Sequence, residues 1–255
     1  LINNQSYASF MAVLIASNGG VAERLERTAF TDEKSMRDML LRNPDMIPVY
    51  EIDEDIRLLA IKRELRVPES DSDKFADAVA VDKNGSIYLI ETKLFTNSDK
   101  RRVVAQVLSY GASLWASSQS SGQFLDILNE SCLDLFNKEF LDYANDFFSF
   151  ADGGLESFKD SISKNWDDGV FKFVVYMDQV GDDLKNLVTY INKRSKFDLY
   201  LVGVDYYQQK DVEIIIPKLY GVPDRKEVEI ATSKKSQGSS GMISEEFLRS
   251  AEIQL

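Results

Sequence analysis

The stretch that most constrains the fold is FADAVAVDKNGSIYLIETK, residues 75–93. Apolar residues alternate up to Asp82, a Lys-Asn-Gly turn signal follows, and a second apolar run ends in Glu-Thr-Lys. Two apolar runs joined by such a turn predict an antiparallel β-hairpin. Glu91 and Lys93 are two residues apart on the second strand, so we expect their side chains on one face of it.

The length of the turn decides where Asp77, near the start of the first strand, comes to lie. A two-residue loop would place Asp77 opposite Thr92. A three-residue loop over residues 83–85, with Gly85 in the left-handed conformation, places Asp77 directly opposite Glu91. We favour the three-residue loop, because it puts two carboxylates and the lysine ammonium on one face, as in a metal site with an adjacent cation.

The chain has no histidine and a single cysteine, Cys132. The lack of histidine excludes Ser-His and Cys-His catalytic pairs and zinc sites built on imidazole. Metal chemistry would then depend on carboxylate and carbonyl oxygens, which suit hard cations such as Mg²⁺ or Mn²⁺. A single cysteine rules out an intrachain disulfide, and we expect the protein to lie in a reducing cytoplasm.

The formal charge of −12 weighs against a broad nucleic-acid-binding surface. Nonspecific binding of that kind depends on neutralising phosphates with Lys and Arg, whereas a narrow, metal-bridged contact does not. No apolar run approaches the roughly 20 residues that cross a bilayer, so we expect no membrane partner. We interpret the apolar opening segment as part of a helical stretch over residues 5–29, broken at Gly19-Gly20, rather than as a signal peptide.

A further helix is predicted from its start signal. Thr31 or Asp32 can cap it, and it should end before Asn43-Pro44, because the residue before a proline avoids the helical conformation. Glu33 lies in its first turn. An anion at a helix N-terminus is favourable by itself, so Glu33 needs no other role to be explained.

After the hairpin we expect a helix over about residues 99–115. Arg102, Gln106 and Tyr110 are spaced four apart and therefore lie along one face of it. A polar boundary between the core and solvent explains such a row without any function.

Polar residues of the hairpin and of its two flanking helices together resemble the signature of the PD-(D/E)XK nuclease superfamily. The matching residues are Asp77, Glu91, Thr92 and Lys93 of the hairpin, Gln106 and Tyr110 of the following helix, and Glu33 of the preceding helix. Gln106 and Tyr110 are similar to the Q-x-x-x-Y element of the RecB-like branch. Ala76 stands where the motif has proline, and the resemblance covers roughly residues 31–115.

This resemblance implies a restriction-endonuclease-like α/β fold, with a mixed sheet flanked by helices, and a metal-dependent nuclease. Asp77, Glu91 and the Thr92 carbonyl would hold Mg²⁺ or Mn²⁺, and Glu33 would bind a metal water or a second ion. Lys93 would orient the attacking water or stabilise the developing negative charge. The alternative without function is a plain cross-strand salt bridge at the end of a sheet.

The resemblance also implies a nucleic-acid partner, with DNA favoured over RNA. Gln106 and Tyr110 would hold water or a backbone phosphate, and Arg101 and Arg102 would contact the strand. A homodimer is expected as one way to cut both strands of a duplex.

Outside residues 31–115 only the order of the expected elements guides the interpretation. The domain would span residues 1–232, with an acidic helical insertion at about 118–168, a flexible linker at 233–241 and the start of a further helix at 242–255. The other expected elements are an edge strand at 58–67, a buried strand at 171–177, a helix at 182–193, and strands at 197–206 and 212–216. The strand–helix–strand order predicts a parallel crossover.

Two other functions fit the same sequence. One is a binding or regulatory protein that uses the nuclease fold without catalysis, because a fold does not by itself imply activity. The other is a protein-interaction module in which the acidic helical insertion contacts a partner.

Overall fold

A computed structural model describes residues 13–16, 20–68, 74–96, 100–209 and 212–221, and its main feature is a six-stranded mixed sheet. The strands, in their order across the sheet, are β3 (Leu58–Val67), β4 (Lys74–Asp82), β5 (Ile87–Lys93), β6 (Phe171–Met177), β7 (Leu199–Gln209) and β8 (Val212–Tyr220). The β5–β6 and β6–β7 pairs are parallel and the others antiparallel, so both the predicted crossover and the edge position of β3 are confirmed.

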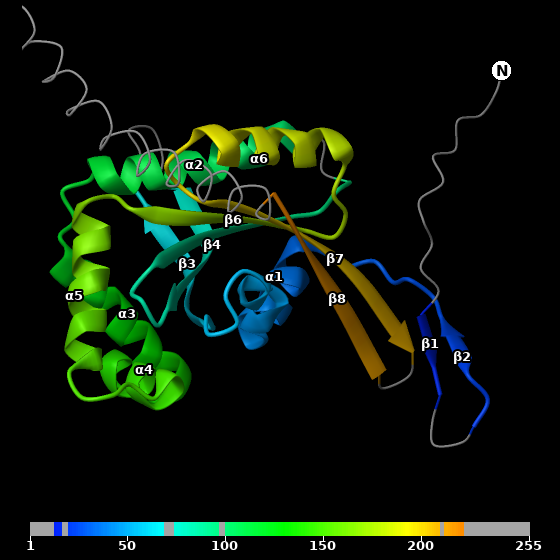
Figure 1. Cartoon of the computed structure of the whole chain (residues 1–255), viewed down its shortest axis with the longest axis horizontal. Coiled ribbons are helices and arrows are strands. Elements are labelled where there is room, and N and C mark those ends of the chain that lie inside the picture. Colours follow the sequence, from blue (N-terminus) through cyan, green and yellow to red (C-terminus); the bar gives the residue numbers. More distant parts are fainter. Residues whose placement is uncertain (1–12, 17–19, 69–73, 97–99, 210–211, 222–255) are drawn as a thin grey trace, which may run out of the picture.

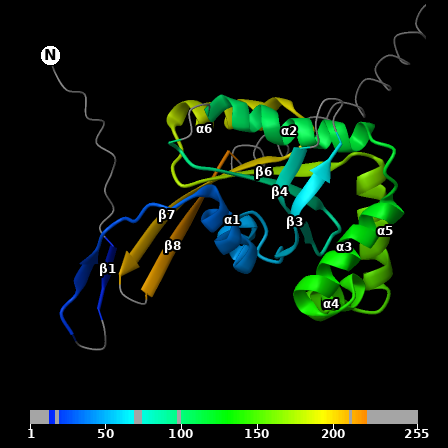
Figure 2. The ribbon, with the colours of Figure 1, turned by 180° about the vertical axis from the view of Figure 1, so that it is seen from behind.

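Helices cover both faces of this sheet (Figures 1 and 2). One face carries α1 (Glu33–Arg42), and the opposite face carries α2 (Lys100–Ala116) and α6 (Asp182–Arg194). Each face has its own hydrophobic core, which separates the α1 side from the α2 side. The central strands are therefore buried on both sides, which is why their sequences are nearly continuous apolar runs. The chain has the expected α/β architecture.

The hairpin turn has the three-residue form. The Asp82 amide donates to the Ser86 carbonyl at 3.2 Å, and Gly85 has a φ of 74°. The Asp82 carboxylate accepts hydrogen bonds from the amides of Asn84 at 2.9 Å and Ser86 at 3.0 Å, which stabilises the loop from inside. The register that places Asp77 opposite Glu91 is thereby confirmed.

The predicted insertion is a set of three helices at one end of the sheet, α3 (Ser121–Phe136), α4 (Phe140–Phe148) and α5 (Gly154–Asp167) (Figure 1). Its buried aromatic residues belong to the same core as the α2 face of the sheet, and they include Phe124, Phe140, Phe158 and Trp166. Cys132 is buried among them, and burial raises the pKa of its thiol to about 11, as suits a structural cysteine. The insertion thus extends the core.

The helix predicted over residues 5–29 is wrong where the chain is described. Two short strands, β1 (Val13–Ile15) and β2 (Glu23–Leu25), pair there in antiparallel fashion. A short apolar run has no periodicity that separates strand from helix, and the β-branched residues of β1 favour a strand. Of the two glycines expected to break that helix, Gly19 lies outside the described residues and Gly20 precedes β2.

The strand predicted to stop at Ile216 instead continues through Pro217 to Tyr220. Pro217 lies opposite Val204, and β8 is the outermost strand of the sheet. An edge strand tolerates proline because half of its backbone groups have no neighbouring strand to bond.

None of the described helices combines the length and apolar character needed to cross a bilayer. The predicted linker at 233–241 and the predicted helix at 242–255 lie outside the described residues.

Candidate active site

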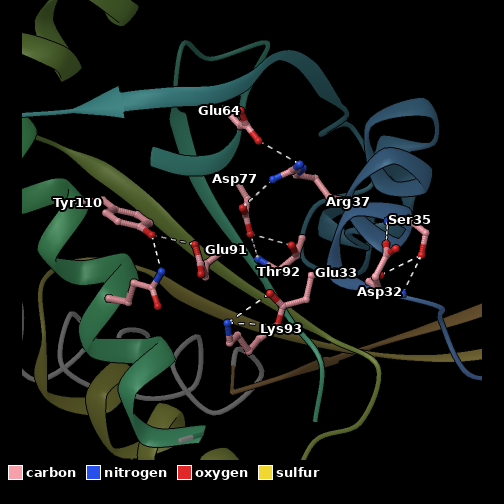
Figure 3. A network of polar contacts seen from close by, with 11 residues as sticks. Asp32, Glu33, Ser35, Arg37, Glu64, Asp77, Glu91, Thr92, Lys93 and Tyr110 are labelled. Carbon is pink, nitrogen blue, oxygen red and sulfur yellow. Dashed lines mark hydrogen bonds and ion pairs between the residues drawn. The ribbon is translucent and has the colours of Figure 1, made fainter. Parts of the chain in front are cut away.

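The N-terminus of α1 brings Glu33 to the end of β5. Asp32 is the N-cap, and its carboxylate accepts the Ser35 amide at 2.6 Å, so the helix starts where its capping signal predicts. Glu33 then reaches across to the strand end, where its carboxylate lies 3.1 Å from the Lys93 ammonium and accepts the Leu94 amide at 3.2 Å (Figure 3). Lys93 therefore has a defined position rather than a free side chain.

Side chains along β4 do not alternate regularly between the two faces of the sheet next to Asp77. Ala76 and Val79 both pack in the core on the α2 side, whereas Ala78 packs in the core on the α1 side. Strict alternation would put Ala76 with Ala78, so the strand is irregular at Asp77. Consequently Asp77 turns toward Arg37 of α1, and the expectation that its carboxylate shares one face with that of Glu91 is wrong.

Both oxygens of the Asp77 carboxylate have donors. Oδ2 accepts the Thr92 amide at 2.8 Å and the Thr92 hydroxyl at 2.7 Å. Oδ1 lies 3.0 Å from a guanidinium nitrogen of Arg37 (Figure 3). Asp77 is thus fastened to the end of β5 on one side and to α1 on the other.

Glu91 points to the opposite helix. It is 3% exposed, and its Oε2 accepts the Tyr110 hydroxyl of α2 at 3.0 Å (Figure 3). Gln106 in turn donates its amide to the Tyr110 hydroxyl oxygen at 2.6 Å, which directs the tyrosine proton toward Glu91. The side of α2 that the four-residue spacing predicts is turned toward the site. Gln106 and Tyr110 on that side fix the orientation of Glu91.

Burial and the neighbouring charge of Asp77 raise the pKa of Glu91 to about 8, although the bond from Tyr110 opposes them. The raised pKa reflects a buried carboxyl that lacks a cation strong enough to offset its desolvation. Burial and the Glu91 charge also raise the pKa of Tyr110, which therefore stays a neutral donor.

Replacing Glu91 with glutamine should change how stability depends on pH in metal-free protein. The carboxyl has a pKa of about 8 in the fold against an ordinary 4.5, so the unfolded chain releases its proton first as the pH rises. Stability conferred by Glu91 is therefore complete below pH 4.5 and is lost by pH 8. Relative to Glu91→Gln, wild type should lose on the order of 2–4 kcal/mol of unfolding free energy across this window. Urea unfolding in EDTA at pH 5 and pH 8.5 measures the difference.

The exposed Glu156 of α5 offers a matched control, because Glu156→Gln removes the same charge from the surface. A pH dependence that is identical in wild type and Glu91→Gln would show that Glu91 titrates normally.

Sequence reasoning missed two residues of this cluster, Arg37 and Glu64. Arg37 lies four residues after Glu33 on α1. That spacing predicts that the two side chains lie on the same face of the helix, so Arg37 could have been found from the sequence. Glu64 had no such signal, since a φ of 59° in the middle of β3 is an uncommon backbone conformation for a residue other than glycine.

Other predicted residues do not join the cluster in the same way. Arg102 is exposed on α2, and the side chain of Arg101 lies outside the described part of the structure. Across the described ranges no three Asp, Glu or Cys side chains converge as a set that could hold one metal ion. Glu33, Asp77 and Glu91 are therefore not a single ligand set in this arrangement.

The chemistry available at the site is that of two hard carboxylates beside an ammonium. Glu91 is buried, Asp77 is partly buried, and each is held by hydrogen bonds that fix its orientation. A divalent cation would offset the burial and the charge of Asp77 that raise the pKa of Glu91, and oxygen donors of this kind suit Mg²⁺ or Mn²⁺.

Comparison of the chain with protein-family models, curated proteins and solved structures finds no match.

Proposed function

We propose that the chain is a metal-dependent nuclease of the PD-(D/E)XK type on a restriction-endonuclease-like fold, acting on phosphodiester bonds with DNA favoured over RNA. The observation that carries the proposal is the buried Glu91, whose pKa is raised to about 8, opposite Asp77 and two residues from Lys93. Strongly shifted carboxyls beside a charge partner are frequent at functional sites. A plain salt bridge would leave the Glu91 pKa low.

Asp77 and Glu91 would hold the metal ion, together with the Thr92 carbonyl, and Glu33 would bind a metal water or a second ion. Carboxylate and carbonyl oxygens are the donor types that Mg²⁺ and Mn²⁺ prefer, and these ions take few protein oxygens and keep several waters. When bound, such an ion neutralises charge on the phosphate and acidifies a water molecule.

Lys93 would act on the phosphate. Glu33 fixes its ammonium with contacts of 3.1 and 3.3 Å, and the side chain stays 27% exposed and so within reach of a substrate. A positioned ammonium stabilises negative charge that develops on the phosphoryl oxygens. Tyr110 and Gln106 would serve by keeping Glu91 oriented toward the ion.

The rest of the substrate would be bound by few contacts. Arg102 is exposed one turn before Gln106 on α2 and would meet a backbone phosphate, with Arg101 beside it in the sequence. A homodimer would supply two sites for cutting both strands, and the buried Cys132 suits a cytoplasmic location.

A non-catalytic protein on the same fold is the second candidate. The observation that favours it is that Asp77 and Glu33 already have cationic partners, Arg37 and Lys93. A chain with a formal charge of −12 would also suit a partner other than a long nucleic acid.

Titration of Mg²⁺ and Mn²⁺ against single- and double-stranded DNA and RNA tests the proposal. We expect cleavage that requires the ion, is abolished by EDTA and is strongest on DNA. Stoichiometric metal binding without cleavage of any of these substrates would favour the non-catalytic protein instead.

A further inference from the structure

Arg37 links two carboxylates at the edge of the candidate site. One guanidinium nitrogen lies 3.0 Å from Asp77 Oδ1, and another lies 3.0 Å from Glu64 Oε1 (Figure 3). The side chain is only 14% exposed, and its Nε is buried with no hydrogen-bond partner among the described residues. The structure thus places a partly buried cation directly against one of the two carboxylates proposed to bind a metal.

The backbone of β3 is irregular near Glu64, the second carboxylate partner of Arg37. Glu64 lies between Arg63 and Leu65, which pair with Ala78 and Ala76, so Glu64 faces Asp77 across the two strands. Its φ of 59° and the register shift between Ala60 and Lys62 make this part of β3 irregular. Irregular strand positions of this kind re-aim side chains and are common beside active sites.

We propose that Arg37 is an internal counter-ion that competes with a divalent metal ion for Asp77, and that Glu64 shares the guanidinium with Asp77 and so limits this competition. The inference rests on the proposed function only for the metal ion itself. Without metal, the guanidinium offsets the repulsion between Asp77 and Glu91. A metal ion held by Asp77 would be repelled by this guanidinium, which contacts the same carboxylate at 3.0 Å, because the partly buried site screens charge weakly.

Two substitutions should move metal affinity in opposite directions. Arg37→Gln removes the competing cation and should tighten Mn²⁺ binding by about tenfold or more. Glu64→Gln removes a neighbouring anion and leaves the guanidinium with Asp77 as its remaining carboxylate partner within the described residues. It should therefore weaken Mn²⁺ binding by about threefold or more. Arg37→Lys keeps the charge and should remain closer to wild type than to Arg37→Gln. Structural damage would weaken binding in all three variants, so a gain in affinity is diagnostic.

Calorimetric titration of the full chain with Mn²⁺, after treatment with EDTA, measures these affinities without any activity assay. Arg42→Gln is the matched control, because Arg42 is an exposed arginine in the last turn of the same helix and should leave the affinity unchanged. Circular dichroism of each variant at the titration temperature checks that it is folded.

Equal or weaker Mn²⁺ binding by a folded Arg37→Gln would overturn the inference. The proposed function would stand in that case, provided that wild type binds Mn²⁺ and Asp77→Asn does not. If neither wild type nor Arg37→Gln binds Mn²⁺, the proposed metal site is wrong and the inference fails with it.

Discussion

Lys93→Ala is expected to lower metal-dependent cleavage by about 10²–10⁴-fold while leaving the protein folded. The ammonium is the cationic group that the structure sets at the end of β5, and Glu33 holds it through two contacts of 3.1 and 3.3 Å. Its loss removes charge stabilisation that is needed most in the transition state, so kcat should fall more than KM rises. The surface position of the pair, 27% and 32% exposed, limits the loss of stability to about 1 kcal/mol.

Asp77→Asn is expected to have an effect of similar size for a different reason. The amide keeps the shape of the side chain but loses the negative charge that would hold the cation. Single-turnover cleavage of the best DNA substrate, measured over a range of Mg²⁺ concentrations, separates the two variants. Extra Mg²⁺ should partly restore Asp77→Asn and should not restore Lys93→Ala.

An ion pair at the far end of the hairpin provides controls for both substitutions. Lys83 lies in the turn at the other end, where it pairs loosely with the exposed Asp55 at 3.6 Å. Lys83→Ala and Asp55→Asn make the same chemical changes away from the site and should cleave like wild type. If Lys93→Ala and Asp77→Asn also cleave like wild type, the nuclease assignment is wrong.

Gly85→Ala is expected to destabilise the protein by about 2–5 kcal/mol. The φ of 74° costs a residue with a Cβ about 1–2 kcal/mol. The added methyl group would also lie 2.6 Å from Ser161 Cβ and 2.9 Å from the Ile162 amide nitrogen and the Phe158 carbonyl oxygen. Backbone atoms of a packed helix cannot move aside easily, and overpacking of this kind costs a further 1–3 kcal/mol or so.

Gly153→Ala separates the two contributions to this loss. Gly153 has a φ of 77°, but a Cβ there would have nothing within 4 Å. The substitution should therefore cost only the backbone strain, about 1–2 kcal/mol. Urea unfolding of both variants gives the difference, and equal losses would mean that the contact between the turn and α5 contributes nothing. Gly85→Ala should also weaken Mn²⁺ binding, because the turn sets the register that aligns Asp77 with Glu91.

Several features of the site could be predicted from local sequence alone. The capping signal at Asp32 determined where α1 starts and hence where Glu33 lies. The turn chemistry of residues 83–85 determined the register, because Gly85 is the residue that accepts a left-handed conformation without strain. The four-residue spacing of Gln106 and Tyr110 determined that both lie along one face of α2.

Each error has an identifiable physical cause. Residues 13–15 are too few for any periodicity to distinguish a strand from a helix. The sequence around Pro217 predicts a strand end, because the tolerance of proline depends on β8 being at the edge, which is a property of the whole sheet. Regular alternation along β4 predicts Asp77 on the face of Glu91, but the strand is irregular at the position beside Ala76.

The sequence by itself determined the hairpin, its register and the identity of the polar residues at its end, since these follow from interactions between residues close in the chain. Only the tertiary structure decided what each polar residue contacts. Arg37 and Glu64 are 27 positions apart in the sequence, yet they meet at 3.0 Å because α1 packs beneath β3 and β4. The pKa of Glu91 likewise depends on burial under α2 and on the charge of Asp77 across the hairpin. Burial and long-range charge arise only when the elements pack together, so they could not be read from local patterns.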